Sequence, residues 1–487
     1  MSALLGGGAL SGCVPPAREL PLVLVQGVAP LGLDPHLNGD FSTFGALSNV
    51  YDGLTFLDGD LKVQPALAES WESPDELTWR FHLRPGVVFH DRRPVTAEDV
   101  VWSLKRAREH PKSDVAGYLH AVGRVRALDP RTVEIETSRH YPTLLNRLAF
   151  VLVVPARSSG SIESAVGTGP YRIAAFQPGA LLELEAFDGY WGARPVEPRA
   201  VLEFVTSTTQ RRERLARGGV ALASQLAPKE VAALSEAAGC RLLTGASMAV
   251  TYIQLQTQKP PFSDPRVREA LDVALDRDRV VAADVAGHGR PAGQIVSRSV
   301  FGFNPEIQPA SRDLARAAAL LRAAGHASGL DVELTFHDGK DPAELLRQLS
   351  EAGFRIEPKA MPWDDLYARL RARTVELYLG TAIADSGDAG DILDTKIHTP
   401  DPPAGYGGSN YVGYSDPTLD ALIEESNSAE NPEKRGRLLQ SAVKRVSEER
   451  PLVPLYVPDD LYCLGEGIEW KPRRDGRVLV REISRAR

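Results

Sequence analysis

Apolar and polar positions follow their most regular pattern between residues 331 and 379. Segments that alternate, as half-buried strands do, exchange there with segments of helical spacing. The pattern predicts the order strand, helix, strand, helix, strand, over residues 331–336, 341–352, 354–358, 362–372 and 375–379. This order implies an α/β fold with a parallel sheet and right-handed crossovers.

The segment after the third of these strands is the first candidate site. Ligands of parallel sheets bind beyond the carboxyl ends of the strands. Residues 380–393, with the sequence GTAIADSGDAGDIL, hold that position and are rich in Gly and Asp. Asp385, Asp388 and Asp391 recur there every third residue. This spacing does not match an EF-hand loop, which needs alternating oxygen ligands and a distal Glu, so calcium is not expected.

Other parts of the chain show the same mixture of elements. Alternation predicts three more strands, over residues 20–26, 78–83 and 132–137. The run 96–99 (TAED) has the form of a capping box at a helix start. Asp264-Pro265 and Asp416-Pro417 each predict another helix, because Asp accepts free N–H groups of the first turn and Pro fits the first helical position.

Composition limits the classes of protein that fit this chain. The 487 residues include 56 Lys and Arg and 64 Asp and Glu, a formal charge of −8, and the hydrophobic fraction is 43%. These values are typical of a globular protein, and the length allows roughly two to four folding units. A net acidic chain is not attracted to phosphate backbones, so no nucleic-acid partner is expected. No run reaches about 18 consecutive apolar residues, so no spanning helix is expected.

The N-terminus suggests a lipid anchor. Residues 10–13 (LSGC) follow a short uncharged stretch and match the lipobox of bacterial lipoproteins, in which the Cys is acylated. We therefore predict a signal segment over 1–13 and lipidation at Cys13, which would hold the protein on a membrane without a spanning helix. The alternative is a buried apolar N-terminus with a chance Cys, since the basic residues that open a signal peptide are missing.

Motifs for enzymatic, metal or redox chemistry are missing from the sequence. It contains no G-x-S-x-G, H-E-x-x-H or phosphate-binding P-loop motif. It also contains no C-x-x-C pair, which leaves zinc knuckles and thioredoxin-type sites without support. We expect no catalytic residue, no metal and no cofactor. Whether Cys240 and Cys463 form a disulfide is left open by their spacing.

An Asp that follows a strand can also bind a ligand without catalysing a reaction. Burying a carboxylate is costly unless it meets a cation, and a ligand ammonium can be that cation when a cleft closes. We assign this role to Asp385. For Asp388 and Asp391 a solvated turn that caps a helix at Ile392 stays open as the alternative.

A set of short motifs then links the chain to one family. The motifs are YDGL (51–54), PALAESW (65–71), FHLRPGVVFHD (81–91), PVTAEDV (94–100), GTGPY (167–171), QKPPF (258–262), RVREAL (266–271) and YSDP (414–417). Together they resemble the extracellular solute-binding proteins of the peptide/nickel class, family 5, which are receptors of dipeptide and oligopeptide ABC importers. The likeness runs from about residue 20 to about residue 458.

The resemblance implies a two-lobed periplasmic-binding-protein-like fold of type II, hinged by two strands. Lobe I would comprise three segments, with an extra inserted subdomain, and lobe II would follow. The implied boundaries are 14–51, 166–258 and 452–487 for lobe I, 52–165 for the inserted subdomain and 259–451 for lobe II.

The resemblance also implies where the ligand binds. In peptide-binding members an Asp behind a strand of lobe II pairs with the ligand ammonium, and Asp385 and then Asp388 fall in that segment. Loop 37–42 and the segment 252–256 fall where the family contacts ligand. The residues assigned from them are Asn38, Gly39, Phe41, Tyr252, Gln254 and Gln256. The sequence departs from the peptide binders at Thr381-Ala382, where the family often has Gly-Trp.

These observations predict a monomeric, lipid-anchored receptor outside the cytoplasm. It would bind a peptide or similar amine-bearing solute and deliver it to ABC permease and ATPase subunits. Two alternatives stay open. One is a binder of a metal chelate or another non-peptide solute, because the Trp and a clear Arg anchor are missing. The other is an enzyme that uses Asp385 and Asp388 as an acid and base pair.

Overall fold

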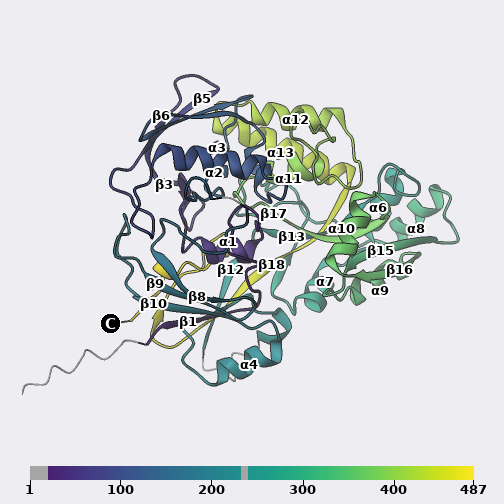
Figure 1. Cartoon of the computed structure of the whole chain (residues 1–487). Helices are drawn as coiled ribbons and strands as arrows, with labels where there is room; N and C mark the ends of the chain where they lie inside the picture. The colour runs from purple at the N-terminus through teal and green to yellow at the C-terminus, as the bar shows by residue number, and fades with distance from the viewer. Residues whose placement is uncertain (1–19, 159, 232–239, 487) are drawn as a thin grey trace, which may run out of the picture.

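The computed structural model describes residues 20–158, 160–231 and 240–486. The predicted signal segment and Cys13 lie outside these ranges. The described chain forms two α/β lobes, and the end of the chain returns to the lobe that holds the first strand (Figure 1). These features confirm the two-lobed fold expected from the sequence.

One twelve-stranded sheet runs through both lobes. Its order is β16-β15-β17-β13-β18-β11-β1-β10-β9-β8, and β12 and β14 also pair with β18. The strands are β1 (Leu22–Gln26), β8 (Tyr171–Gln177), β9 (Leu181–Ala186), β10 (Arg199–Phe204), β11 (Leu222–Ser224), β12 (Arg241–Ala246), β13 (Ala249–Leu255), β14 (Gly289–Pro291), β15 (Leu330–His337), β16 (Phe354–Met361), β17 (Leu377–Ile383) and β18 (Leu452–Leu464).

Strand β18 belongs to both lobes. Its first residues pair with β13 of lobe II, and its last residues, 459–464, pair with β11 and β12 of lobe I. The second crossing is the short link between β12 and β13. These two crossings, one strand and one link, stand where the family resemblance implies a hinge.

The lobe boundaries need a correction. The prediction placed residues up to 258 and from 452 onward in lobe I. In the structure β13 and residues 452–456 pack into the cores of lobe II. The reason is that β13 is hydrogen-bonded on both sides, by β17 and β18. Lobe II therefore begins near β13 and extends to the middle of β18.

The inserted subdomain has its own sheet and core. Its sheet has the order β4-β5-β7-β6, and helix α2 (Ala97–Glu109) packs against it. The predicted capping box is present, because the Thr96 N–H donates to the Asp99 carboxylate over 2.9 Å. The strands are β4 (Ala68–Glu72), β5 (Thr78–Leu83), β6 (Val122–Asp129) and β7 (Thr132–Thr137).

The predicted strand–helix alternation in lobe II is confirmed. Helix α9 (Ala343–Glu351) follows β15, and α10 (Trp363–Arg371) follows β16. Strand β15 pairs in parallel with both β16 and β17. However, β17 also pairs antiparallel with β13, so the sheet is mixed.

The remaining elements include the helices predicted at Asp264 and Asp416, whose carboxylates cap α6 and α12. None of the helices within the described ranges combines the length and apolar character needed to cross a membrane. The elements are α1 (Phe41–Leu47), β2 (Thr55–Leu57), β3 (Val63–Pro65), η1 (Ala116–Leu119), α3 (Leu144–Leu148), α4 (Thr208–Ala216), η2 (Pro228–Glu230), α6 (Pro265–Val273), α7 (Arg277–Asp284), α8 (Leu314–Ala323), α11 (Gly390–Ile392), η3 (Leu393–Ile397), α12 (Pro417–Asn427), α13 (Pro432–Glu449), β19 (Ile468–Glu469), η4 (Val480–Glu482) and β20 (Ser484–Arg485).

A disulfide joins Cys240 to Cys463. The two Cα atoms lie 5.5 Å apart although 223 residues separate them in sequence. The bond fastens the segment before β12 to the lobe I end of β18. The pairing that the sequence left open is thus decided by the fold.

We expect reduction of this disulfide to lower the free energy of unfolding by about 2–4 kcal/mol, since a cross-link restricts the unfolded chain. The measurement is thermal unfolding with and without reductant, in protein that carries Cys13→Ser. The control is the additional double substitution Cys240→Ser, Cys463→Ser, whose stability should not respond to reductant. Equal sensitivity of both proteins would contradict a stabilising role.

Candidate functional site

A cavity of about 230 Å³ lies between the lobes. Lobe I and its subdomain form most of its wall, and lobe II closes it. The lining residues of lobe II are Met248, Ile383 and Asp385, and those of lobe I and the subdomain are Gly39, Asp40, Phe41, Phe44, Val115, Tyr118, Phe150, Asp475 and Arg477.

Stacked aromatic rings make one wall of the cavity. The rings of Phe44 and Phe150 stack with centroids 5.1 Å apart, and those of Phe150 and Tyr118 with centroids 4.9 Å apart. We call these three residues the aromatic ladder. The ladder offers an apolar face to any ligand between the lobes.

The loop before α1 brings two of the predicted residues to the cavity, Gly39 and Phe41. Asp40 between them caps α1, since its Oδ1 accepts the Ser42 N–H at 3.1 Å and the Thr43 N–H at 3.0 Å. Asn38 is not part of the wall. Its amide donates to the Asp34 carbonyl at 3.1 Å and so supports the loop from within.

Asp385 lies in the cavity wall just beyond β17. Within the described part of the chain, no Lys, Arg or His nitrogen comes within 4.0 Å of its carboxylate. Withdrawal from bulk water raises its pKa to about 7, and the neighbouring Asp391 adds to this effect. The more distant positive charges of Arg147, Arg477 and Lys396 act in the opposite direction. The site thus presents a carboxylate that needs a cation.

The other two Asp residues of the segment already have partners. Asp388 is held by Arg435, whose Nη2 donates to Oδ1 at 2.9 Å, and it lies outside the cavity wall. Asp391 accepts the Ser386 N–H at 2.7 Å and pairs with Arg147 of the inserted subdomain at 2.7 Å. Across the described ranges, no three His, Cys, Asp or Glu side chains are grouped so as to hold a metal ion.

The Arg147–Asp391 pair joins the two lobes directly. Arg147 comes from α3 of the subdomain, Asp391 follows β17 of lobe II, and both side chains are buried. A buried ion pair contributed by two lobes can form only when the lobes meet. The structure is therefore a closed form, and this pair is part of what closes it.

The predicted contacts on β13 lie elsewhere. Tyr252 is fully buried in a lobe II core, with its ring 6.3 Å from that of Tyr378. Gln254 is buried further along the same strand and Gln256 just beyond its end, and none of the three lines the cavity. Because β13 runs away from the cavity into lobe II, only Met248, just before the strand, reaches it.

The sequence analysis missed the C-terminal contribution to the wall. Asp475 and Arg477 flank Gly476, whose φ of +69° allows a tight turn beside Phe41. A Gly within a dense charged run, RRDGR, directly before the apolar residues 478–480 was the available signal. Such a run is normally a solvated surface, and nothing local reveals that this one is buried.

Comparison with known protein families identifies the family of this chain. The family model described as "Bacterial extracellular solute-binding proteins, family 5 Middle" matches residues 62–402, more than half of the chain. The chain belongs to this family. Its members are extracellular solute-binding proteins, which agrees with the two lobes, the hinge and the cavity of this family 5 protein.

Relatives of this family 5 protein are named for several ligands. Heme-binding protein A of Haemophilus influenzae is 29% identical over 471 residues, covering 88% of this chain and 85% of the relative. The dipeptide-binding protein of Escherichia coli K12 is 26% identical over 472 residues, covering 88% of each. The glutathione-binding protein GsiB of Salmonella typhi is 27% identical, covering 93% and 92%.

Solved structures share the fold of this family 5 protein. The periplasmic binding protein DppA of Helicobacter pylori, in complex with the peptide STSA, superposes with a TM-score of 0.82 at 22% identity, covering 96% of this chain and 98% of that one. AgaA from A. tumefaciens R10, in complex with agropinic acid, gives the same TM-score and identity and covers 96% and 99%.

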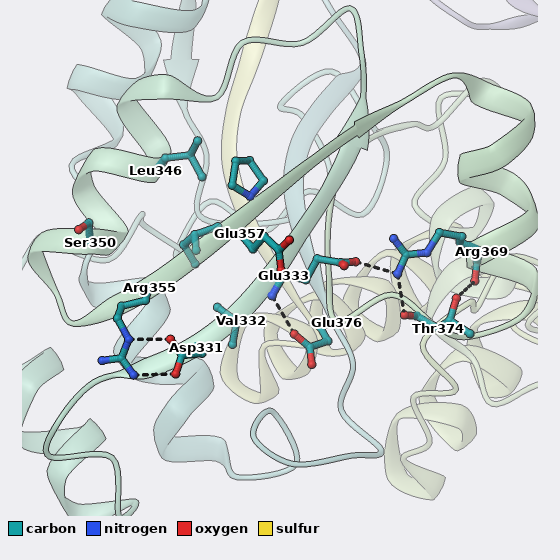
Figure 2. Close-up of a pocket in the computed structure, with 12 residues that line it drawn as sticks. Asp331, Val332, Glu333, Leu346, Ser350, Arg355, Glu357, Arg369, Thr374 and Glu376 are labelled. Carbon is teal, nitrogen blue, oxygen red and sulfur yellow. Dashed lines mark hydrogen bonds and ion pairs between the residues drawn. The ribbon is translucent and has the colours of Figure 1, made fainter.

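A wider hollow of about 850 Å³ lies on lobe II of the family 5 protein, over β15 and β16. Figure 2 shows Asp331 against Arg355 and Glu333 beside Arg369, at 2.6 and 2.7 Å. These charges neutralise each other, and lobe I contributes nothing to the lining. Lobe closure cannot act on this hollow, so the interlobe cavity is the better candidate.

Proposed function

We propose that this family 5 protein is the substrate-binding component of an ABC importer. It captures a peptide or a similar small amine-bearing solute in the interlobe cavity and delivers it to permease and ATPase subunits. The observation that carries the proposal is Asp385, a carboxylate in the cavity wall with no cationic side chain within 4.0 Å among the described residues. A ligand ammonium would supply the missing charge.

The size of the cavity favours a compact solute. Its volume of about 230 Å³ corresponds to roughly eight water molecules at about 30 Å³ each. The relatives named for a dipeptide and for glutathione support a ligand of this size. In the proposed cycle the lobes open about β18 and the link before β13, the solute enters, and closure buries its ammonium against Asp385.

A ligand screen tests the proposal. Protein with Cys13→Ser is heated with amino acids, dipeptides, tripeptides and longer peptides, and binding is read as a rise in the melting temperature. We expect one solute bound per chain and a decrease in the radius of gyration on binding. A screen in which no amine-bearing solute binds would overturn the proposal.

We expect the affinity for amine ligands to fall as the pH drops below 7. The Asp385 pKa is about 7 in the unoccupied cavity, and a bound ammonium lowers it, so binding at low pH must release a proton. Affinity is therefore full above pH 7 and falls up to about tenfold per pH unit below it. Calorimetry at pH 6 in buffers of different ionisation enthalpy should detect close to one released proton, and far less at pH 8.

We also propose that Cys13 carries a lipid anchor outside the cytoplasm. The lipobox supports the anchor, and the Cys240–Cys463 disulfide supports an oxidising compartment. Substituting Cys13→Ser should move the protein from the membrane fraction to the soluble fraction of cells that express the full chain. Cys240→Ser serves as the control and should leave the distribution unchanged. An equal distribution of wild type and Cys13→Ser would contradict the anchor.

A further inference from the structure

We propose that a second pocket, which lies on the hinge, binds a small apolar carboxylate, and that its occupant holds the lobes closed. The pocket has a volume of about 100 Å³. Among the described residues none lines both this pocket and the interlobe cavity, so the inference goes beyond the proposed function. We call it the hinge pocket, and the residues of its wall that matter most here are Ser247, Arg290, Gln294, Arg298, Phe303 and Asp459.

Both crossings between the lobes contribute to the hinge pocket. Ala246, which ends β12, and Ser247 come from the link, and Val457 and Asp459 come from the middle of β18. Ala246 and Asp459 pair with each other at the end of the lobe I part of the sheet. The lobe II wall comes from within residues 290–309. A rotation of the lobes about the hinge therefore moves one side of the pocket against the other.

The same link reaches the interlobe cavity. Ser247 lines the hinge pocket, whereas Met248, the next residue, lines the interlobe cavity. The two sites therefore respond to the same rotation. The structure is a closed form in which the hinge pocket is present, so an occupant that fits this form shifts the population toward closure. By thermodynamic linkage it then raises the affinity of the interlobe cavity for its own ligand.

Polar groups inside the hinge pocket already have partners. Gln294 is 2% exposed, and its amide is used at both ends, since Nε2 donates to the Asn304 carbonyl at 2.7 Å and Oε1 accepts the Asn304 N–H at 3.0 Å. The hydroxyls of Ser297 and Ser299 bond to each other at 2.9 Å. The apolar residues of the wall include Ala292, Val296, Phe303, Ile307 and Val457. The interior is therefore suited to an apolar body.

Two arginines decide the charge of the hinge pocket. Arg298 is exposed, and within the described ranges no carboxylate lies within 4.0 Å of its guanidinium, which sits over the Phe303 ring at 5.9 Å from the centroid. Arg290 faces Asp459, the one acidic residue of the described wall, at 3.9 Å. Two cations against one anion leave a guanidinium that a ligand carboxylate can fill through charge-assisted hydrogen bonds.

A short branched acid is the probe that fits these features. The volume of about 100 Å³ corresponds to roughly three water molecules at about 30 Å³ each, which suits a short alkyl group. We choose 3-methylbutanoate, whose carboxylate would lie beside the exposed Arg298. Its neutral amide, 3-methylbutanamide, has nearly the same shape, so the pair isolates the contribution of the charge.

Ligand-observed NMR titration tests the site in protein that carries Cys13→Ser. We expect the acid to bind, the amide to bind at least about tenfold more weakly, and Arg298→Glu to weaken the acid by at least about tenfold, the loss of one hydrogen bond to a charged group. Arg437→Glu, which reverses an exposed arginine of α13 outside the hinge pocket, should leave both affinities unchanged. Because Arg298 is exposed, Arg298→Glu should keep its melting temperature.

Small-angle scattering tests the effect on closure without any amine ligand. Saturating 3-methylbutanoate should lower the radius of gyration of the unliganded protein and leave that of Arg298→Glu unchanged. A ligand from the amine screen should in turn tighten the binding of the acid by about fivefold or more. Displacement of the acid by that ligand would instead place the acid in the interlobe cavity and overturn the inference.

The remaining outcomes also decide the inference. Failure of the acid to bind, equal binding of acid and amide, or undiminished binding to Arg298→Glu would refute a carboxylate site at the hinge. Binding without a change in the radius of gyration would refute the coupling to closure. None of these results concerns Asp385, so the proposed function would stand.

Discussion

Replacing Asp385 with Asn is expected to weaken the binding of amine ligands by about 2–5 kcal/mol, the cost of truncating a desolvated charge pair. The substitution keeps the shape of the side chain but removes the only charge that the described residues of lobe II present to the cavity. The ligand ammonium would then be buried without a counter-ion, and burying an unpaired charge is costly. Titration calorimetry with any ligand from the screen measures the loss.

Two controls accompany Asp385→Asn. Asp365→Asn removes an exposed carboxylate of α10 outside the cavity and should leave affinity unchanged. The unliganded Asp385→Asn protein should be at least as stable as the wild type at pH 8. The sign follows from the raised Asp385 pKa, since an ionised group with a raised pKa destabilises the fold above its unfolded pKa. Unaltered amine affinity in Asp385→Asn would refute the assignment.

Replacing Arg147 with Gln is expected to hold the lobes apart. The substitution leaves Asp391 buried without its cation, which costs about 3–5 kcal/mol. Arg147 and Asp391 come from different lobes, so the cost falls on the closed form, and ligand affinity drops although Arg147 does not line the cavity. Small-angle scattering of the ligand-saturated variant should give a larger radius of gyration than that of the wild type.

The double substitution Arg147→Gln, Asp391→Asn is the matched test of this closure. It removes both charges, so no carboxylate is left buried without a cation, and affinity should recover in part. An affinity loss as large as that of Arg147→Gln alone would show that Arg147 acts through something other than Asp391. A thermal scan of the unliganded proteins shows how much of the affinity loss is a loss of folding stability.

Local features of the fold could be predicted because their causes are local. The alternation over 331–336 and the Asp-Pro starts at 264–265 and 416–417 are set by neighbouring residues, and the structure has a strand or a helix at each. The antiparallel partner of β17 could not be predicted in this way. Strand β13 lies more than a hundred residues earlier in the chain, and pairing over such a distance leaves no periodic signal.

Much the same division holds for the candidate site. Asp385 could be found because it follows a strand of predicted parallel order, and Gly39 and Phe41 because the family resemblance implies ligand contacts from loop 37–42. Asp388, three residues further on, follows the same strand and is an equally good candidate on sequence alone. Arg435, 47 residues away, occupies its carboxylate, and only the packing of α13 reveals this.

The sequence by itself determined the two-lobed α/β class, the starts of the main helices and the acidic segment behind the third strand of lobe II. Only the tertiary structure decided which charged groups have partners: Asp388 and Asp391 are paired, whereas Asp385 has no cationic side chain within 4.0 Å among the described residues. The physical reason is the distance along the chain between the residues that interact. Secondary structure follows from neighbours along the chain, but a buried charge is satisfied by residues from distant segments that fold together.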